Sequence, residues 1–364
     1  ITFILGTRPE AIKLAPIISE FKKNNSINVR VITTGQHKEM VSQVLNLFNI
    51  IPDLDLNLMR VDQSLTHITT QTLIGLEREF ITFKPKLVLV QGDTSTAFAA
   101  GLAAFYQQIA IGHVEAGLRT DNYYDPFPEE MNRRLLSQIS ELHFAPSESS
   151  KTNLIKAGIT KNIFVTGNSV IDALLYMSEK VDQIPIDGID WKNQKVILTT
   201  IHRRENRNKK LEEIVKGLLK ILDNFSDTII LFPMHRNEEI RKVIKQYLGK
   251  NKRAILIEPL DYDLLVSAMK NCFFLMTDSG GLQEEAPVFG KPVLVLRETT
   301  ERQEAIEAGT AKLIGTNTDK IFTEASHLLS SKSKYDKMSN SINPYGDGTT
   351  SQIIHNLCIE WLND

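Results

Sequence analysis

Short apolar runs alternate with longer amphipathic segments along almost the whole chain. The apolar runs are uninterrupted, which is typical of parallel strands that helices cover on both faces. The sequence therefore predicts an α/β fold with two Rossmann-like, doubly wound parallel-sheet domains. The predicted strands are residues 1–5, 29–33, 87–91, 109–114, 142–144 and 163–166 in a first series, and 196–200, 228–232, 254–257, 273–277, 292–296 and 311–314 in a second.

Segments with a helical spacing of apolar residues separate these strands. The predicted helices are residues 11–22, 38–48, 65–81, 97–106, 129–139, 149–157, 171–180, 211–222, 238–248, 262–270, 281–288, 319–329 and 351–362. A short segment with Pro185 and Gly188 lies between the two series. We therefore predict domains at residues 1–184 and 185–348, and a C-terminal helix in 349–364 that packs back on the first domain. The carboxyl ends of the two sheets would face a central, ligand-binding cleft.

Composition narrows the class of protein. The 364 residues are 42% hydrophobic and 24% charged, as in an ordinary globular protein, and are long enough for two domains. A net charge of −2 gives no general attraction to nucleic acid or to an anionic membrane, and no apolar stretch is long enough to span a bilayer. Cys272 and Cys358 lack metal-type spacing and are interpreted as reduced thiols, which fits a cytoplasmic location.

Three acidic residues stand out in the first series of strands. Asp93 and Glu115 come just after predicted strands, and Glu129 opens a predicted helix. Acids at the carboxyl ends of parallel strands point into the crevice where such sheets bind ligands. A carboxylate there is costly unless it is paired or used, so the cluster indicates chemistry. Arg119 and Arg133 are close in sequence, and a structural salt-bridge network of the five residues is the alternative interpretation.

The loop after the first strand has the features of an anion site. Gly6 lets the backbone approach a ligand, Pro9 suits a first helical turn, and Arg8 and Lys13 add positive charge at a helix N-terminus. The spacing of glycines excludes a dinucleotide fingerprint. A solvated helix start with ordinary surface charges is the alternative.

A second anion site is predicted after residues 273–277. Ser279 can cap the next helix, and Gly280 and Gly281 expose backbone N–H groups that suit a diphosphate. Glu285, about one turn later, could accept hydrogen bonds from ribose hydroxyls. A normally capped helix, with acids that suit its dipole, explains the same residues without a ligand.

Two histidines and an arginine follow other strands of the second series. His202 lies just past residues 196–200 beside Arg203, where it could protonate or hydrogen-bond a leaving phosphate. His235 holds a similar place after the next strand, and Arg302 is a candidate hydroxyl or phosphate contact. Structural roles remain open for each of them.

Taken together, these motifs resemble one family, the non-hydrolysing UDP-N-acetylglucosamine 2-epimerases, which have the two-domain GT-B fold. The resemblance extends over nearly the whole chain and in the right order. The matching segments are residues 6–13, 35–37, 92–94, 113–120, 128–130, 202–206, 278–287, 300–302 and 343–348. It implies inversion at C2 between UDP-GlcNAc and UDP-ManNAc by a homodimer that needs no metal and no other cofactor, and it implies a place in the biosynthesis of cell-surface polysaccharides.

The resemblance also implies roles for individual residues. The catalytic residues would be Asp93, Glu115, Glu129 and His202, with Arg133 in support; the UDP and sugar contacts would be Arg8, Lys13, Ser279, Gly280, Gly281, Glu285 and Arg302. A second, regulatory UDP-GlcNAc site would use Gln36, Gln63, Arg203 and His235. Glu39 and Asp62 stand where some relatives line that site with glutamine and arginine, and two acids would repel a diphosphate.

The C2 proton of this sugar is not acidic, because C1 carries no carbonyl. If the C1–O bond breaks first or concurrently, positive charge on C1 makes that proton removable and gives a glycal and UDP. Carboxylates can stabilise the cation, and one can take the proton. Which acid serves which face stays open. The alternatives are a hydrolysing epimerase that releases UDP and ManNAc, a GT-B glycosyltransferase, and a regulatory module that binds a UDP-sugar.

Overall fold

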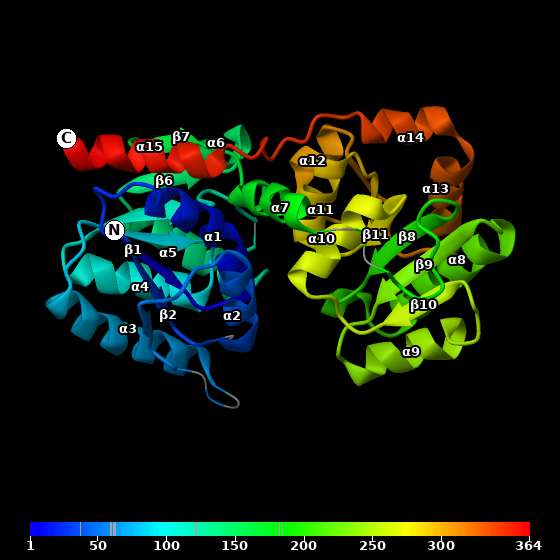
Figure 1. The fold of residues 1–364 in the computed structure, drawn as a ribbon, viewed down its shortest axis with the longest axis horizontal. Helices are drawn as coiled ribbons and strands as arrows, with labels where there is room; N and C mark the ends of the chain where they lie inside the picture. Colours follow the sequence, from blue (N-terminus) through cyan, green and yellow to red (C-terminus); the bar gives the residue numbers. More distant parts are fainter. Residues whose placement is uncertain (37, 59, 61–62, 121, 182, 184) are drawn as a thin grey trace. The chain divides into compact units, whose positions relative to one another are not determined.

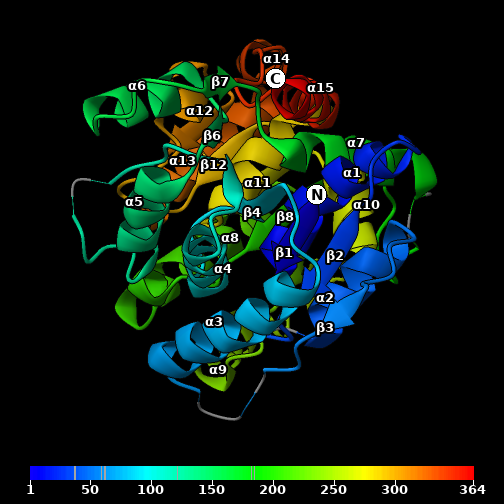
Figure 2. The same ribbon diagram turned by 90° about the vertical axis from the view of Figure 1, so that its left-hand side faces the viewer.

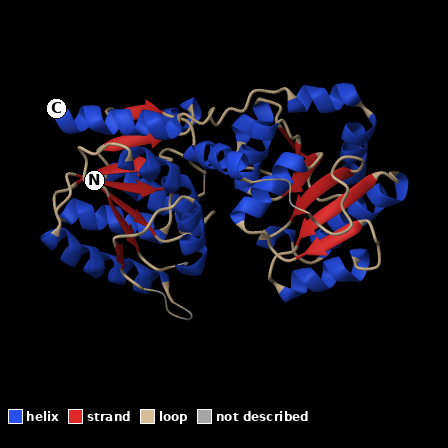
Figure 3. Ribbon diagram, in the orientation of Figure 1, coloured by secondary structure: helices blue, strands red, loops and turns tan. Residues whose placement is uncertain are grey.

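The computed structural model describes residues 1–36, 38–58, 60, 63–120, 122–181, 183 and 185–364. The chain divides into unit 1, which is Ile1–Ala173 with Tyr345–Asp364, and unit 2, which is Leu174–Pro344. The division falls inside helix α7 (Ser169–Lys180), whereas the sequence places a domain boundary at 184. Each unit is a layer of parallel strands between helices, which confirms the predicted α/β class and the two doubly wound sheets (Figure 3).

The sheet of unit 1 has the strand order β3-β2-β1-β4-β5-β6-β7, and all of its pairings are parallel. The chain leaves β1 toward β2 on one side and later returns to β4 on the other. The carboxyl ends of β1 and β4 therefore form the topological switch point, where open sheets bind ligands. The strands are β1 (Thr2–Leu5), β2 (Arg30–Thr33), β3 (Leu54–Asp55), β4 (Leu87–Gln91), β5 (Ala110–Val114), β6 (Leu142–Ala145) and β7 (Ile163–Val165).

Helices cover both faces of this sheet. Figure 2 shows α3, α4 and α5 on one face and α1 and α2 on the other. The C-terminal helix α15 lies beside α1, where the rings of Phe21 and His355 are 4.8 Å apart and Ile354 and Cys358 are buried (Figure 1). The helices are α1 (Arg8–Lys22), α2 (Lys38–Leu47), α3 (Leu65–Thr82), α4 (Ser95–Tyr106), α5 (Glu129–Ile139), α6 (Glu148–Lys156) and α15 (Thr350–Asn363).

Unit 2 repeats the arrangement with the strand order β10-β9-β8-β11-β12-β13, again with parallel pairing. Its switch point lies between β8 and β11. The strands are β8 (Lys195–Thr200), β9 (Thr228–Pro233), β10 (Ala254–Ile257), β11 (Phe274–Thr277), β12 (Val293–Val295) and β13 (Ala311–Leu313). Leu218 of α8, Ile244 of α9 and Ile321 of α13 join one buried cluster with these strands.

The helices of unit 2 follow the same alternation, with short helical pieces between them. They are α8 (Lys209–Asn224), α9 (Glu238–Leu248), α10 (Tyr262–Asn271), α11 (Gly280–Glu285), α12 (Gln303–Glu307), α13 (Thr318–Ser330) and α14 (Lys332–Ser339), with the 3-10 turns η1 (Arg204–Asn206) and η2 (Ala286–Phe289). The sequence missed β3, α12 and α14, because they are short and bury little surface: none of the residues of α14 is buried. Within the described residues, every helix is too short or too polar to cross a lipid bilayer.

Candidate active site

Arg133 fixes the first of the predicted acids, Asp93. The guanidinium Nε donates to Asp93 Oδ2 at 3.1 Å, and Nη2 donates to the same oxygen. The Asn132 amide donates to the Asp93 backbone carbonyl at 2.9 Å. Both donors lie on α5, which therefore holds the loop after β4. Arg133 uses only one carboxylate oxygen, and the Asp93 side chain stays 25% exposed, so Oδ1 is available to a ligand.

Glu115 is held in a strained backbone conformation at the end of β5. Its φ is 64°, in the left-handed region that non-glycine residues avoid, and such strain is common at functional sites. Its carboxylate accepts hydrogen bonds from Lys13 Nζ, Gln91 Nε2 and, at 3.0 Å, Asn168 Nδ2. The sequence assigned Lys13 to substrate contact, and the structure pairs it with Glu115. Gln91 and Asn168 were not predicted.

The two glutamates that open α5 have different surroundings. Glu129 is partly exposed, whereas Glu130 is fully buried. Glu130 accepts from Arg133 Nη1 at 3.0 Å and from Arg134 Nε at 2.5 Å. Arg133 thus joins a structural carboxylate to Asp93. Arg119, the other arginine near the acids, donates instead to the Leu118 carbonyl and the Ser137 hydroxyl.

A second buried glutamate, Glu10, ties the loop after β1 to the loop after β4. It accepts from the backbone N–H of Gly6 and of Thr7, at 2.9 and 2.7 Å, and from the Thr94 hydroxyl at 2.7 Å. The two loops of the switch point are therefore one hydrogen-bonded unit. Arg8, the first residue of α1, is partly exposed and forms no ion pair within the described residues, so its charge is available to an anion.

Two buried histidines lie side by side on neighbouring strands of the unit 1 sheet. His113 and His143 are paired in register on β5 and β6, and both are buried. His113 Nε2 donates to the Gly92 carbonyl at 2.8 Å, and this bond supports the turn that carries Asp93. Burial lowers the pKa of His113 to about 3 and that of His143 to about 4, so both rings are neutral at pH 7.

These histidines give the stability of unit 1 a defined pH dependence. As the pH falls from 6.5 towards 4, the unfolded chain binds a proton at each histidine and the folded chain does not. The free energy of unfolding should then fall by about 1.4 kcal/mol per pH unit for each of the two. Urea unfolding at several pH values checks this, and His143→Gln should make the dependence less steep by one such increment. Parallel curves for variant and wild type would contradict it.

In unit 2, the loop after β8 packs against the residue that follows β11. Asp278 is fully buried and accepts from His202 Nδ1 at 2.9 Å. The backbone N–H of Arg203 donates to it at 2.9 Å, and the Asn206 amide donates at 3.0 Å. The His202 side chain is 41% exposed, so its other ring nitrogen is accessible. The sequence predicted His202 and did not single out Asp278, although an acid directly after a buried strand was the signal that found Asp93.

The predicted diphosphate cradle is compact. Ser279 occupies the N-cap position of α11, but its side chain accepts no capping hydrogen bond, contrary to the expected cap. A side chain at Gly280 would come within 2.8 Å of Glu301 Oε1, and one at Gly281 would come within 3.2 Å of Glu285 Oε1. Both neighbours are the ends of flexible glutamate side chains, so these contacts alone do not require glycine at either position.

Arginines and acids form a dense network beside this loop. Arg302 Nε donates to the buried Glu284, so the arginine predicted to contact substrate is also held in place. Glu301 accepts from Arg297 at 2.7 Å and from Arg203 at 3.3 Å. Burial alone would raise the pKa of Glu301, but the arginines around it lower that pKa to about 2, so it stays ionised. Sequence reasoning missed Glu284 and Glu301.

The residues of the predicted regulatory site fall in both units. In unit 1, Gln36 accepts from the Thr96 hydroxyl at 2.8 Å and Gln63 accepts from the backbone N–H of Arg60 at 3.3 Å. In unit 2, the exposed His235 lies in the electrostatic field of His202, and its pKa is lowered by partial burial and by that neighbour. Glu39 is exposed in the first turn of α2, and Asp62 lies outside the described residues.

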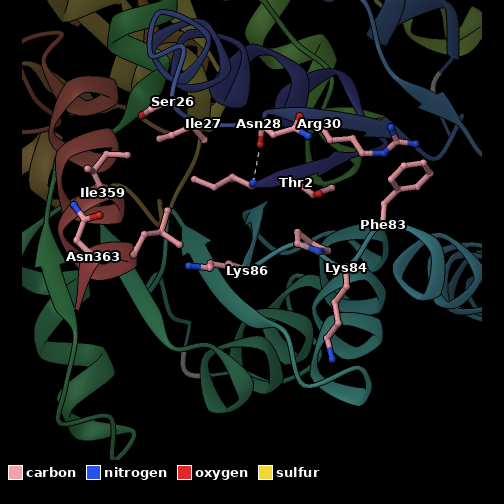
Figure 4. A pocket seen from close by; sticks show the side chains of 13 residues that line it. Thr2, Ser26, Ile27, Asn28, Arg30, Phe83, Lys84, Lys86, Ile359 and Asn363 are labelled. Atoms are coloured by element: carbon pink, nitrogen blue, oxygen red, sulfur yellow. Dashed lines mark hydrogen bonds between the residues drawn. The ribbon is translucent and has the colours of Figure 1, made fainter.

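A cavity of about 590 Å³ opens elsewhere in unit 1. Its lining includes Thr2, Arg30, Lys84 and Lys86 at the amino ends of the strands, with Ile359 from α15 (Figure 4). None of the predicted site residues lines it. Since functional side chains gather at the opposite edge of the sheet, this cavity is not the candidate active site. In the described residues, no group of His, Cys, Asp and Glu side chains is arranged to hold a metal ion.

Comparisons with known proteins bear on this arrangement. A family described as UDP-N-acetylglucosamine 2-epimerase matches residues 19–358. The chain is 48% identical over 358 residues to the UDP-N-acetylglucosamine 2-epimerase of Bacillus subtilis (strain 168), with 96% of this chain and 92% of that protein covered. It is 46% identical to the enzyme of that name from Campylobacter jejuni, with 100% of this chain and 98% of that protein covered.

Solved structures agree with the sequence matches. The UDP-GlcNAc 2-epimerase from Neisseria meningitidis bound to UDP-GlcNAc superimposes with a TM-score of 0.92 at 47% identity, covering 99% of both chains. That of Methanocaldococcus jannaschii in complex with UDP-GlcNAc and UDP gives a TM-score of 0.82 at 35% identity, again with 99% of both chains covered. The predicted GT-B fold is therefore confirmed. The chain belongs to the UDP-N-acetylglucosamine 2-epimerase family.

Proposed function

We propose that this protein is a non-hydrolysing epimerase that interconverts UDP-GlcNAc and UDP-ManNAc through elimination and re-addition of UDP. One observation carries the proposal: two carboxylates are fixed separately at the carboxyl ends of adjacent strands. Arg133 fixes Asp93 after β4, and Lys13, Gln91 and Asn168 fix Glu115 after β5. An inversion at an unactivated carbon requires such a pair, because a proton leaves one face of C2 and returns to the other.

The surroundings of these acids suit a cationic transition state. As the C1–O bond breaks, its electron pair moves to the β-phosphate oxygen and positive charge develops on C1 and the ring oxygen. A fixed carboxylate stabilises this charge without reorganisation. A second carboxylate takes the C2 proton, the C1=C2 double bond forms, and a 2-acetamidoglucal remains beside UDP. Asp93, Glu115 and Glu129 are the acids that we assign to these tasks.

Residues of unit 2 and of the loop after β1 would bind the nucleotide. The backbone N–H groups of Gly280 and Gly281 and the Ser279 hydroxyl would donate to the diphosphate, whereas the Ser279 N–H donates to the Thr277 hydroxyl at 3.0 Å. Arg8 offers a guanidinium that no described acid neutralises. Glu285 and Arg302 would contact the ribose or the diphosphate. His202, with its accessible ring nitrogen, would give a proton to the departing β-phosphate oxygen and take it back on re-addition. The bacterial relative from Neisseria meningitidis was crystallised bound to UDP-GlcNAc, which supports this substrate.

The proposal predicts that deuterium from the solvent enters the sugar at C2 when the reaction runs in ²H₂O. The protein is incubated with UDP-GlcNAc, and the sugars are followed by NMR. Because the C2 proton is lost to a carboxylate that exchanges with solvent, deuterium should appear at C2 of both UDP-GlcNAc and UDP-ManNAc. Free ManNAc that accumulates instead would identify a hydrolysing epimerase. An unchanged UDP-GlcNAc at high protein concentration would overturn both activities.

A further inference from the structure

His202 and Asp278 are brought together by the register of two neighbouring strands. Thr200, the last residue of β8, is the partner of Thr277, the last residue of β11, and their hydroxyl oxygens are 2.7 Å apart. Both strands therefore end at the same level of the sheet. His202 and Asp278 follow directly, at the switch point of unit 2.

Within the described residues, the hydrogen bonds that the Asp278 carboxylate accepts all come from the loop that carries His202. Oδ1 faces His202 Nδ1 at 2.9 Å, and the backbone N–H of His202 donates to the carboxylate at 3.1 Å. Oδ2 accepts from the backbone N–H of Arg203 and from the Asn206 amide. The carboxylate is fully buried, which alone would raise its pKa, but the hydrogen bonds from His202 and Arg203 lower that pKa below the usual value. Asp278 is therefore an ionised acceptor.

An ionised carboxylate only accepts hydrogen bonds, so the nitrogen that faces it must carry a proton. Nδ1 of His202 is consequently the protonated nitrogen of the neutral ring, and Nε2 is the nitrogen that gains and loses the second proton. We propose that Asp278 is a positioning residue, which fixes the tautomer and orientation of His202 so that Nε2 serves the departing phosphate. This inference rests on the proposed function, because it assigns a purpose to the same histidine.

The proton balance of the step follows from this tautomer. Imidazolium at His202 gives its Nε2 proton to the β-phosphate oxygen that receives the electron pair of the broken C1–O bond. The ring is left neutral with its proton on Nδ1, still bonded to Asp278. On re-addition the oxygen returns that proton to Nε2 as the C1–O bond forms. A fixed carboxylate beside Nδ1 stabilises the imidazolium form of this cycle.

Asp278→Asn separates this role from simple support of the loop. The Asn oxygen can still accept from the backbone N–H of Arg203, so the turn is kept. Its amide nitrogen, however, only donates, and a donor opposite Nδ1 drives the ring proton to Nε2. The exposed Asp319, whose carboxylate accepts from Lys220 at 2.8 Å, supplies a matched control as Asp319→Asn in the same unit.

The experiment combines nitrogen NMR of ¹⁵N-histidine-labelled protein with steady-state kinetics. His202→Gln identifies the His202 signals. We expect wild-type His202 to carry its proton on Nδ1, and Asp278→Asn to move it to Nε2 and to lower kcat by about 10²–10⁴-fold with unchanged affinity for UDP. Asp319→Asn should change neither the tautomer nor kcat.

Several outcomes would overturn the inference. The first is a wild-type spectrum in which His202 carries its proton on Nε2. This result overturns the inference even if the Asp278→Asn variant fails to fold. The second is an Asp278→Asn variant in which His202 keeps its proton on Nδ1. The third is an Asp278→Asn variant in which the proton moves to Nε2 but kcat stays at the wild-type value. A wild-type protein that forms no UDP-ManNAc contradicts the proposed function instead, and the NMR measurement still tests the pairing of His202 with Asp278.

Discussion

Asp93→Asn should lower kcat by about 10²–10⁴-fold while leaving the affinity for UDP nearly unchanged. Arg133 donates two hydrogen bonds to Asp93 Oδ2 and leaves Oδ1 to the ligand. An amide keeps the size and can keep an oxygen toward Arg133, but it carries no charge to stabilise a cation and cannot take a proton. The measurement is the initial rate of UDP-ManNAc formation from UDP-GlcNAc, with UDP affinity obtained by calorimetry.

Asp55→Asn provides the control for this variant. Asp55 ends β3 at the same edge of the same sheet, is exposed, and lies 3.4 Å from Lys38. Losing its charge removes no contact that the proposed chemistry needs, so kcat should stay at the wild-type value. If Asp93→Asn also keeps the wild-type kcat, Asp93 has no catalytic role. If it folds but loses affinity for UDP in proportion to its rate, its role is in binding.

The sequence was informative about the fold because the apolar runs mark where buried strands begin and end. Those ends place Asp93 after β4 and His202 after β8 at the carboxyl edges of two parallel sheets. The predicted strands agree with the observed ones to within a residue or two in both units. The missed strand β3, Leu54–Asp55, has too few residues to produce a periodic pattern and is only partly buried.

Pairings between residues distant in the chain could not be predicted in this way. Lys13 lies on α1, directly after β1, and Glu115 follows β5, with β4 between those two strands in the sheet. Nothing in the local sequence indicates that the two side chains are in contact. The pairing of Arg302 with Glu284 is of the same kind. The neighbouring acids Glu129 and Glu130 show the limit most clearly. Both open α5, and only tertiary packing decides that Glu130 is the buried partner of Arg133.

A rule that the sequence already supplied could have identified Asp278. It follows the buried strand β11 just as Asp93 follows β4. The neighbouring Gly280 and Gly281 predict a phosphate cradle, and that interpretation explains the motif without a role for the acid. The backbone φ of 64° at Glu115 has no sequence signal of its own, since strain at a non-glycine residue is maintained by the packing around it.

Gly117→Ala should lower the free energy of unfolding by about 4 kcal/mol or more, among the largest effects of a single substitution. Gly117 has a φ of 92°, which a residue with a side chain rarely adopts. An added Cβ would overlap the Ser150 carbonyl oxygen and lie 2.8 Å from the carbonyl carbon and 3.0 Å from Leu154 Cγ. The obstacle is backbone of α6, so no rotamer change relieves it, and the shift would reach Glu115 in the same loop.

Gly158→Ala isolates the contribution of this overlap. Gly158 has a nearly equal φ of 88°, but an added Cβ meets nothing within 4 Å, so the variant bears only the conformational cost of about 1–2 kcal/mol. Urea unfolding followed by two probes, one for each unit, measures both variants, since a chain of two units need not unfold in one step. Equal losses of stability in the two variants would show that the backbone of α6 yields to the new methyl group. A much larger loss for Gly117→Ala would establish that close packing of the Glu115 loop against α6 requires glycine.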